Sequence, residues 1–145
     1  MHLRFALLLL VAVVPALAFG HAVVQPAESS TGATQQYTLR VPNEKEVPTL
    51  AVRLQFPPQI EVTTVDEPPG WHLALERDAK SRIVSATWTG LLPPKTDVRF
   101  TFTAHNPAAP ANVAWNVVQT YEGALIVEWT GPTGSRTPAS HTDIR

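Results

Sequence analysis

Residues 98–103 read VRFTFT, and this stretch shows the pattern that decides the fold. Apolar and polar residues alternate along it with a period of two, which is typical of a β-strand with one buried and one solvent-facing side. The same alternation recurs along the chain, in runs at residues 37–41, 52–56, 60–64, 71–75, 84–88, 113–117 and 125–129. The sequence therefore predicts a chain built almost entirely of strands.

Clusters of proline and glycine separate these runs, and such clusters mark turns and strand edges. No long helical pattern is present, although residues 43–47 suit a short turn. About eight or nine short strands in roughly 110 residues are typical of an antiparallel sandwich. We expect an all-β, immunoglobulin-like antiparallel β-sandwich as a single domain over residues 21–130, followed by a polar C-terminal segment over residues 131–145.

Residues 1–20 have the layout of a secretory signal peptide. Arg4 supplies a positive charge, residues 5–17 are almost purely apolar, and small residues at 18 and 20 suit a signal peptidase that cleaves before His21. The alternatives are a retained anchor helix, for which the apolar run is short, and cleavage one residue away. We expect an exported protein, periplasmic or extracellular, with no membrane span in the mature chain.

Composition excludes several classes of site. The chain has no cysteine, so disulfides, thiolate metal sites and iron–sulfur clusters are impossible. Met1 is the only methionine, so a chain that starts at His21 carries no soft sulfur ligand. Removal of residues 1–20 takes away Arg4 and no acid, which changes the formal net charge from -1 to -2. No basic field favours nucleic acid as a partner.

Cleavage before His21 would create a metal chelate at the new N-terminus. The α-amino nitrogen and the imidazole Nδ1 of one histidine can bind the same ion, and nitrogen ligands of this kind suit Cu(II). Copper affinity should fall with acidity, because both nitrogens must be unprotonated. The alternative interpretation is that His21 is simply the residue at which the mature chain begins.

The sequence offers little for catalysis. It lacks the Gly-x-Ser-x-Gly nucleophile elbow, and we expect no catalytic residues and no enzyme activity. An oxidative copper enzyme would need a second histidine beside His21, and His105, at a predicted strand end, is the one candidate. His72 is expected on a solvent-facing strand side and His141 in the polar tail. The tryptophans are expected mainly in the core.

Six motifs, in order along the chain, resemble the YcnI-like family of exported copper-binding proteins. Each motif is weak alone, and the set spans nearly the whole predicted mature chain. The motifs are HAVVQP (21–26), YTLRVPNEK (37–45), PGW (69–71), TWTG (87–90), QTYEG (119–123) and VEWTG (127–131).

The resemblance implies a β-sandwich that binds Cu(II) through a single-histidine brace, with a glutamate oxygen and a nearby tryptophan. By position, the histidine is His21 and the tryptophan is Trp129. Arg99 stands nearest to the position of the glutamate, and an arginine does not ligate a metal. Asp97, two residues away on the same strand face, is the predicted replacement. Glu128 is a further oxygen donor, but strand alternation places it opposite Trp129.

We therefore expect a Cu(II)-binding protein that carries, buffers or delivers copper as a metallochaperone, with His21 and Asp97 as ligands and Trp129 close by. Its expected partners are the copper ion and a membrane copper transporter or another copper protein. The alternative is a metal-free β-sandwich that serves as a protein-interaction module at the cell envelope. Fold alone does not discriminate between the two.

Overall fold

The computed structural model describes residues 20–145, so most of the predicted signal peptide lies outside the described residues. The described chain is made of strands and connecting turns. The strands are β1 (Val23–Gln25), β2 (Glu28–Ser29), β3 (Thr34–Asn43), β4 (Thr49–Gln55), β5 (Glu61–Val65), β6 (His72–Arg77), β7 (Ile83–Leu92), β8 (Thr96–His105), β9 (Ala111–Tyr121), β10 (Ile126–Trp129) and β11 (Ser140–Ile144).

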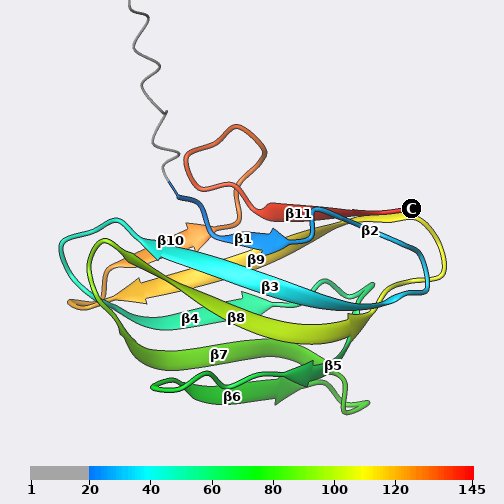
Figure 1. Cartoon of the computed structure of the whole chain (residues 1–145), viewed down its shortest axis with the longest axis horizontal. Coiled ribbons are helices and arrows are strands. Elements are labelled where there is room, and N and C mark those ends of the chain that lie inside the picture. The colour runs from blue at the N-terminus through cyan, green and yellow to red at the C-terminus, as the bar shows by residue number, and fades with distance from the viewer. Residues whose placement is uncertain (1–19) are drawn as a thin grey trace, which may run out of the picture.

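The strands form two sheets that pack face to face (Figure 1). One sheet has the order β1-β3-β8-β5, and the other has the order β2-β11-β9-β4-β7-β6. β10 also pairs with β9, beside the stretch of β9 that pairs with β11. Every pairing is antiparallel except the short parallel contact between β2 and β11. The alternating runs predicted from the sequence thus form an all-β sandwich.

The C-terminal segment belongs to the sandwich and does not trail from it. β11 pairs with β9 from Ser140↔Trp115 to Ile144↔Ala111, and Ile144 is fully buried. The hydroxyl of Thr142, also buried, accepts a hydrogen bond from Trp115 Nε1 at 3.0 Å. The domain boundary expected near Thr130 is therefore wrong, because residues 140–144 complete one sheet.

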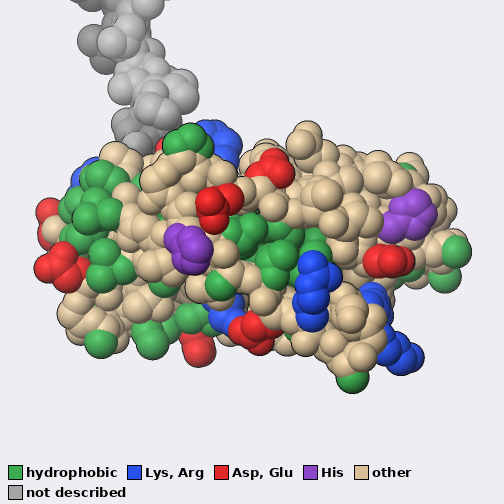
Figure 2. All heavy atoms as spheres, turned by 90° about the horizontal axis from the view of Figure 1, so that it is seen from below, with side chains coloured by type: hydrophobic (Ala, Val, Ile, Leu, Met, Phe, Trp, Pro, Cys, Tyr) green, Lys and Arg blue, Asp and Glu red, His purple; other side chains and the backbone are tan. Residues whose placement is uncertain are grey.

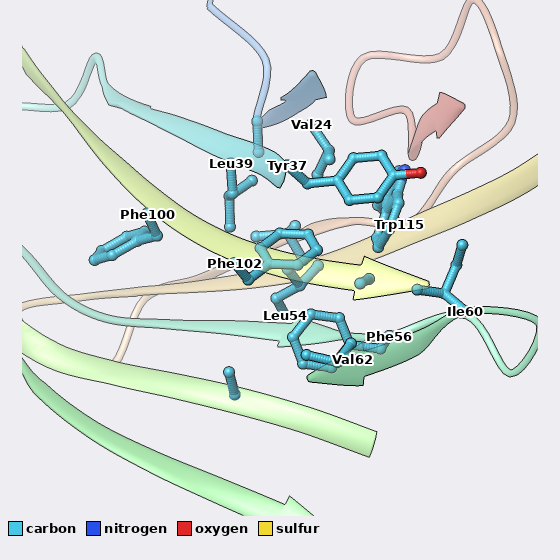
Figure 3. Packing of buried hydrophobic residues seen from close by; sticks show 14 of the residues in the cluster. Val24, Tyr37, Leu39, Leu54, Phe56, Ile60, Val62, Phe100, Phe102 and Trp115 are labelled. Atoms are coloured by element: carbon cyan, nitrogen blue, oxygen red, sulfur yellow. The ribbon is translucent and has the colours of Figure 1, made fainter. Parts of the chain in front are cut away.

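The core lies between the sheets and is rich in aromatic rings (Figure 3). Trp88 stacks on Phe100 with a centroid separation of 4.3 Å, and Tyr37 meets Trp115 at 5.0 Å. Such pairs each contribute about 0.5–1.5 kcal/mol beyond the burial of their area. Trp88 and Trp115 are fully buried and Trp129 nearly so, as expected, whereas Trp71 is half-buried. Non-covalent contacts alone must stabilise this domain, since it has no disulfide.

One face of the molecule mixes charges of both signs, and Figure 2 shows acidic and basic side chains interspersed over it. Within residues 20–145 no helix has the length and apolar character needed to cross a membrane.

Candidate metal centre

Strand β1 fixes the position of His21. Val23 pairs with Arg40 and Val24 with Leu39 on β3, and Ala22 and Val24 turn their side chains into the core. Continuing this antiparallel register by two positions places His21 opposite Pro42. Two contacts with the body of the sandwich therefore hold the start of the domain: the β3 ladder, and a bond from Val24 N–H to Ser140 Oγ at 2.9 Å.

Trp129 lies against His21, as the family resemblance implied. Their ring centroids are 5.7 Å apart and the ring planes are tilted by 48°. Trp129 is 8% exposed, and its Nε1 donates to the buried side chain of Gln119 at 3.0 Å. Glu128, the neighbouring residue on β10, is exposed and faces the other way, as strand alternation predicted.

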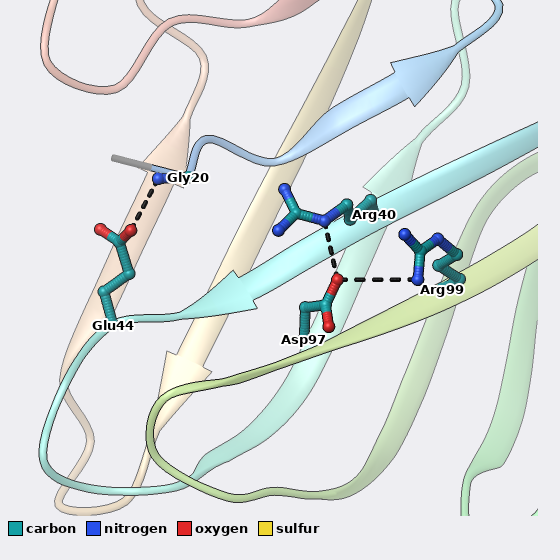
Figure 4. Close-up of polar contacts among 5 residues, drawn as sticks. All are labelled: Gly20, Arg40, Glu44, Asp97 and Arg99. Carbon is teal, nitrogen blue, oxygen red and sulfur yellow. Dashed lines mark hydrogen bonds and ion pairs between the residues drawn. The ribbon is translucent and has the colours of Figure 1, made fainter. Parts of the chain in front are cut away.

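Glu44 is the carboxylate that lines one pocket together with His21 and Trp129. Its Oε1 accepts a hydrogen bond of 2.7 Å from the backbone N–H of Gly20, the residue before His21 (Figure 4). Glu44 follows the end of β3, and buried Asn43 shapes the turn after it. The Asn43 side chain donates to the carbonyl of Val47 at 2.9 Å and accepts from Lys45 N–H at 3.0 Å.

A buried hydrogen-bond network joins the elements that carry Glu44 and Trp129. The Gln119 amide nitrogen donates to the carbonyl of Pro42 at 2.9 Å and to Thr49 Oγ1 at 2.8 Å, while its oxygen accepts from Trp129. Pro42 lies two residues before Glu44. One fully buried amide thus connects the end of β3, strand β4 and strand β10 behind the His21 position.

The structure does not bring Asp97 into the same pocket as His21. Asp97 Oδ2 lies 2.7 Å from Arg40 Nε and 3.7 Å from Arg99 Nη1 (Figure 4). The hydrogen bond from Arg40 holds the pKa of Asp97 below its usual range, so this carboxylate is an ionised partner of arginine. The candidate oxygen ligand is therefore Glu44, and the interpretation of Asp97 as the replacement is corrected.

The other described histidines also lie apart from His21. His105 Nδ1 is bonded to Thr34 Oγ1 at 2.8 Å, at the start of β3, whereas His21 lies opposite Pro42 near the end of that strand. The eight residue-to-residue steps from Thr34 to Pro42 span about 26 Å. His72 lies 3.7 Å from Glu67, and His141 is bonded to Asn112 at 2.8 Å. None of them is placed as a second ligand.

Gly20, His21, Glu44, Trp129 and Arg136 line one pocket at this edge of the sandwich. Within residues 20–145 no group of three or more His, Cys, Asp or Glu side chains is placed to hold a metal ion. A metal here would need a backbone or terminal nitrogen as well as side chains. One imidazole, one carboxylate and an adjacent main-chain nitrogen form a donor set that suits a nitrogen-preferring divalent ion.

Tyr121 lines the adjoining hollow with Glu44 and Trp129. Burial raises the pKa of its hydroxyl, and the negative charge of Glu44 acts in the same direction. Both effects favour the neutral phenol over the phenolate that binds metals. Tyr121 therefore lines this hollow as a neutral side chain and is not a candidate ligand.

The sequence did not predict Glu44 as a candidate ligand, because strand alternation points to oxygen donors on regular strands and Glu44 lies in a turn. Glu44 stands 23 positions after His21 in an irregular turn, where alternation carries no information. The signal for Glu44 in the sequence is the VPNEK motif, residues 41–45, which belongs to the family-like motifs. Only the β1–β3 register brings this acid to the start of the domain.

Comparisons with known proteins agree with this architecture. The chain is 38% identical over 151 residues to a protein of Bacillus subtilis (strain 168) named copper-binding protein CutI, with 97% of this chain and 73% of that protein covered. The crystal structure of an uncharacterized protein from Nocardia farcinica, described as having an immunoglobulin-like fold, matches with a TM-score of 0.76 and 26% identity. The match covers 86% of this chain and 97% of that one, and the expected immunoglobulin-like sandwich is confirmed.

A cohesin from Archaeoglobus fulgidus shares the fold alone, with a TM-score of 0.55, 14% identity, and coverage of 86% of this chain and 90% of the cohesin. The family model described as "Domain of unknown function (DUF1775)" matches residues 21–143, nearly the whole described chain. The resemblance to YcnI-like proteins is thus confirmed, and the chain belongs to the DUF1775 family.

Proposed function

We propose that this protein is exported, is cleaved before His21, and then binds Cu(II) as a carrier, buffer or metallochaperone. The proposed ligands are the α-amino nitrogen and imidazole Nδ1 of His21 and the carboxylate of Glu44, with Trp129 against the imidazole. The relative named copper-binding protein CutI supports copper as the ion. Copper is the cargo in this proposal, and its partners are the proteins outside the cytoplasm that supply or receive it.

The observation that carries the proposal is the 2.7 Å contact between Glu44 and Gly20 N–H. Consecutive backbone nitrogens are at most about 3.6 Å apart, so the carboxylate lies within roughly 6 Å of the His21 nitrogen. Cleavage after Gly20 would release this carboxylate from its partner and create the amine in the same step. An exposed glutamate side chain can then turn toward an ion held by His21.

The donor set supports Cu(II) over Cu(I). Nitrogen and oxygen donors suit the divalent ion, whereas Cu(I) prefers sulfur, and the chain after Met1 has neither cysteine nor methionine. The Trp129 indole lies against the imidazole with a centroid separation of 5.7 Å. A carrier is favoured over an oxidative enzyme because His105, the candidate second histidine, is bonded to Thr34 at the far end of β3.

The test is titration calorimetry of Cu(II) into protein that begins at His21. We expect one ion per chain. The matched control is the same chain with its α-amino group acetylated, because it keeps the imidazole, Glu44 and Trp129 but replaces the amine of His21 with an amide and adds no new amine. The acetylated form should bind at least a hundredfold more weakly, and His21→Ala should bind weakly as well.

Equal binding by the two forms would contradict the brace. Absence of copper binding by the processed chain would favour the alternative, a metal-free interaction module. The mature N-terminal mass of the exported protein tests the cleavage site independently.

A further inference from the structure

Arg136 lies in the loop between β10 and β11 and lines the same pocket as His21, Glu44 and Trp129. The other arginines in the described part of the chain each contact an acceptor: Arg40, Arg53, Arg77, Arg82, Arg99 and Arg145. Arg136 makes no hydrogen bond or ion pair with residues 20–145. Arg136 is exposed, so it brings a positive charge to the lining of this pocket with no acid of its own.

Main-chain hydrogen bonds hold the loop that presents this charge. Gly131 N–H donates to the carbonyl of Thr137 at 2.9 Å, and Ala139 N–H donates to the carbonyl of Gly131 at 2.9 Å. A residue larger than glycine would not fit at position 131, since its Cβ would lie 2.5 Å from Ser135 Oγ. The loop then leads directly into β11, which is paired in the sheet. The backbone that carries Arg136 is thus held by hydrogen bonds between the two ends of the loop.

We propose that Arg136 makes this pocket a site for Cu(II) together with a small organic carboxylate, an inference that rests on the proposed function. The first reason is charge. A divalent ion held by two neutral nitrogens and one carboxylate keeps a net positive charge, and Arg136 adds a second one. Like charges in one pocket repel, and an anion between them offsets the repulsion.

The second reason is coordination number. Cu(II) with nitrogen and oxygen donors favours a square-planar or tetragonal arrangement, and the three proposed donors leave one of its four close positions open. A carboxylate can place one oxygen in that position and offer the other to the planar guanidinium, which matches carboxylates in a two-pronged geometry. Water could fill the open position but would not neutralise Arg136.

The third reason selects an organic anion over an inorganic one. The Trp129 indole, 5.7 Å from the His21 ring, forms an apolar wall of the pocket. An organic carboxylate has carbon atoms that can pack against this wall, whereas phosphate and chloride have none. The chemical class expected is a small carboxylate, either free in the medium or already bound to the copper that reaches the protein.

The experiment uses protein that begins at His21, loaded with one Cu(II), at pH 7 and constant ionic strength set by perchlorate. Acetate is titrated while the visible absorption band and the electron paramagnetic resonance spectrum of copper are followed. We expect a saturable spectral change. Arg136→Gln should raise the apparent Kd for acetate at least tenfold, and Arg136→Lys should give an intermediate value.

Arg99→Gln is the matched control, because it removes an exposed arginine that lies beside Asp97 and not in this pocket. Its acetate Kd should equal that of the unchanged chain. The titration is repeated with phosphate, which should give a weaker change, and with a preformed copper–acetate mixture, which separates delivery of the complex from later capture of the anion.

Copper binding is measured first without acetate. If no copper binds, both the proposed function and this inference fail. If copper binds but acetate has no effect, or Arg136→Gln binds acetate as tightly as the unchanged chain, only the inference is overturned. Copper-dependent dimerisation seen by sedimentation, with acetate inert, would overturn it too, since a carboxylate of a second copy would then hold the open position.

Discussion

Glu44 and Asp97 are two carboxylates at the same end of the sandwich with opposite surroundings. Asp97 lies between the guanidinium groups of Arg40 and Arg99, which face each other across the β3–β8 ladder. Glu44 instead accepts a hydrogen bond from the backbone of Gly20, one residue before His21. Cross-strand like charges destabilise a sheet, so Asp97 has a structural task. The comparison teaches that an acid's neighbours, more than its position on a regular strand, decide whether it is free to bind a metal.

Exchange of these two acids for their amides should separate the two roles, with the largest effect at Glu44. Glu44→Gln keeps the shape of the side chain and removes its charge, so we expect Cu(II) affinity of the processed chain to fall at least tenfold, or about 1.4 kcal/mol. Titration calorimetry against a competing chelator measures the difference.

Asp97→Asn is the matched variant, and its copper affinity should stay within about twofold of the unchanged chain. A tenfold loss in Asp97→Asn with none in Glu44→Gln would reverse the assignment and restore Asp97 as the oxygen donor.

A second, smaller effect is expected from the buried amide behind the pocket. Gln119→Leu leaves the carbonyl of Pro42, Thr49 Oγ1 and Trp129 Nε1 without their partner. Loss of hydrogen bonds at buried polar groups costs about 1–3 kcal/mol, so the free energy of unfolding should fall by that amount. Urea denaturation followed by tryptophan fluorescence measures it.

Gln55→Leu is the control, because Gln55 lies on the neighbouring strand with its side chain exposed. It should change the unfolding free energy by no more than about 0.5 kcal/mol. If the two variants are equally stable, the Gln119 network does not hold the Glu44 and Trp129 elements together.

The alternation of residues 98–103 and its repeats sufficed to predict the sandwich, because burial on one face imposes a period of two. The same reasoning missed β11, since SHTDI, residues 140–144, offers a single large apolar residue. This strand is held by polar contacts: Thr142 accepts from Trp115 and donates to the carbonyl of Pro26 at 2.9 Å. A strand held by hydrogen bonds to distant residues need not show the alternation of apolar and polar residues from which strands are predicted.

The structure separates the family-like motifs into two groups. Some pack against one another, and others contribute residues to the His21 pocket. PGW, residues 69–71, and TWTG, residues 87–90, meet where a Cβ on Gly90 would lie 2.7 Å from the Trp71 ring. These two motifs fit one another by packing. The VPNEK and VEWTG motifs instead supply Glu44 and Trp129 to the His21 pocket. His21 and Trp129 were predictable from the resemblance, whereas Glu44 required the register between β1 and β3.

The smallest effect is expected on stability at the Asp97 cluster. Arg40 lowers the pKa of Asp97, so the ionised form stabilises the folded state at any pH above the unfolded value of about 3.9. This contribution is lost as the pH falls through the lowered folded pKa. Asp97→Asn should therefore be less stable at pH 7 by at most about 1 kcal/mol, since the pair is exposed to solvent.

Urea unfolding of both chains at pH 7, 5 and 3 measures this pH dependence. The stability difference should be the same at pH 7 and 5, smaller at pH 3, and reduced by added salt at each pH. Glu128→Gln, which removes an exposed carboxylate of β10, is the control and should show little difference at any pH. A pH-independent loss in Asp97→Asn would mean that the side chain acts through its shape, and that Arg40 and Arg99 tolerate one another without a negative charge between them.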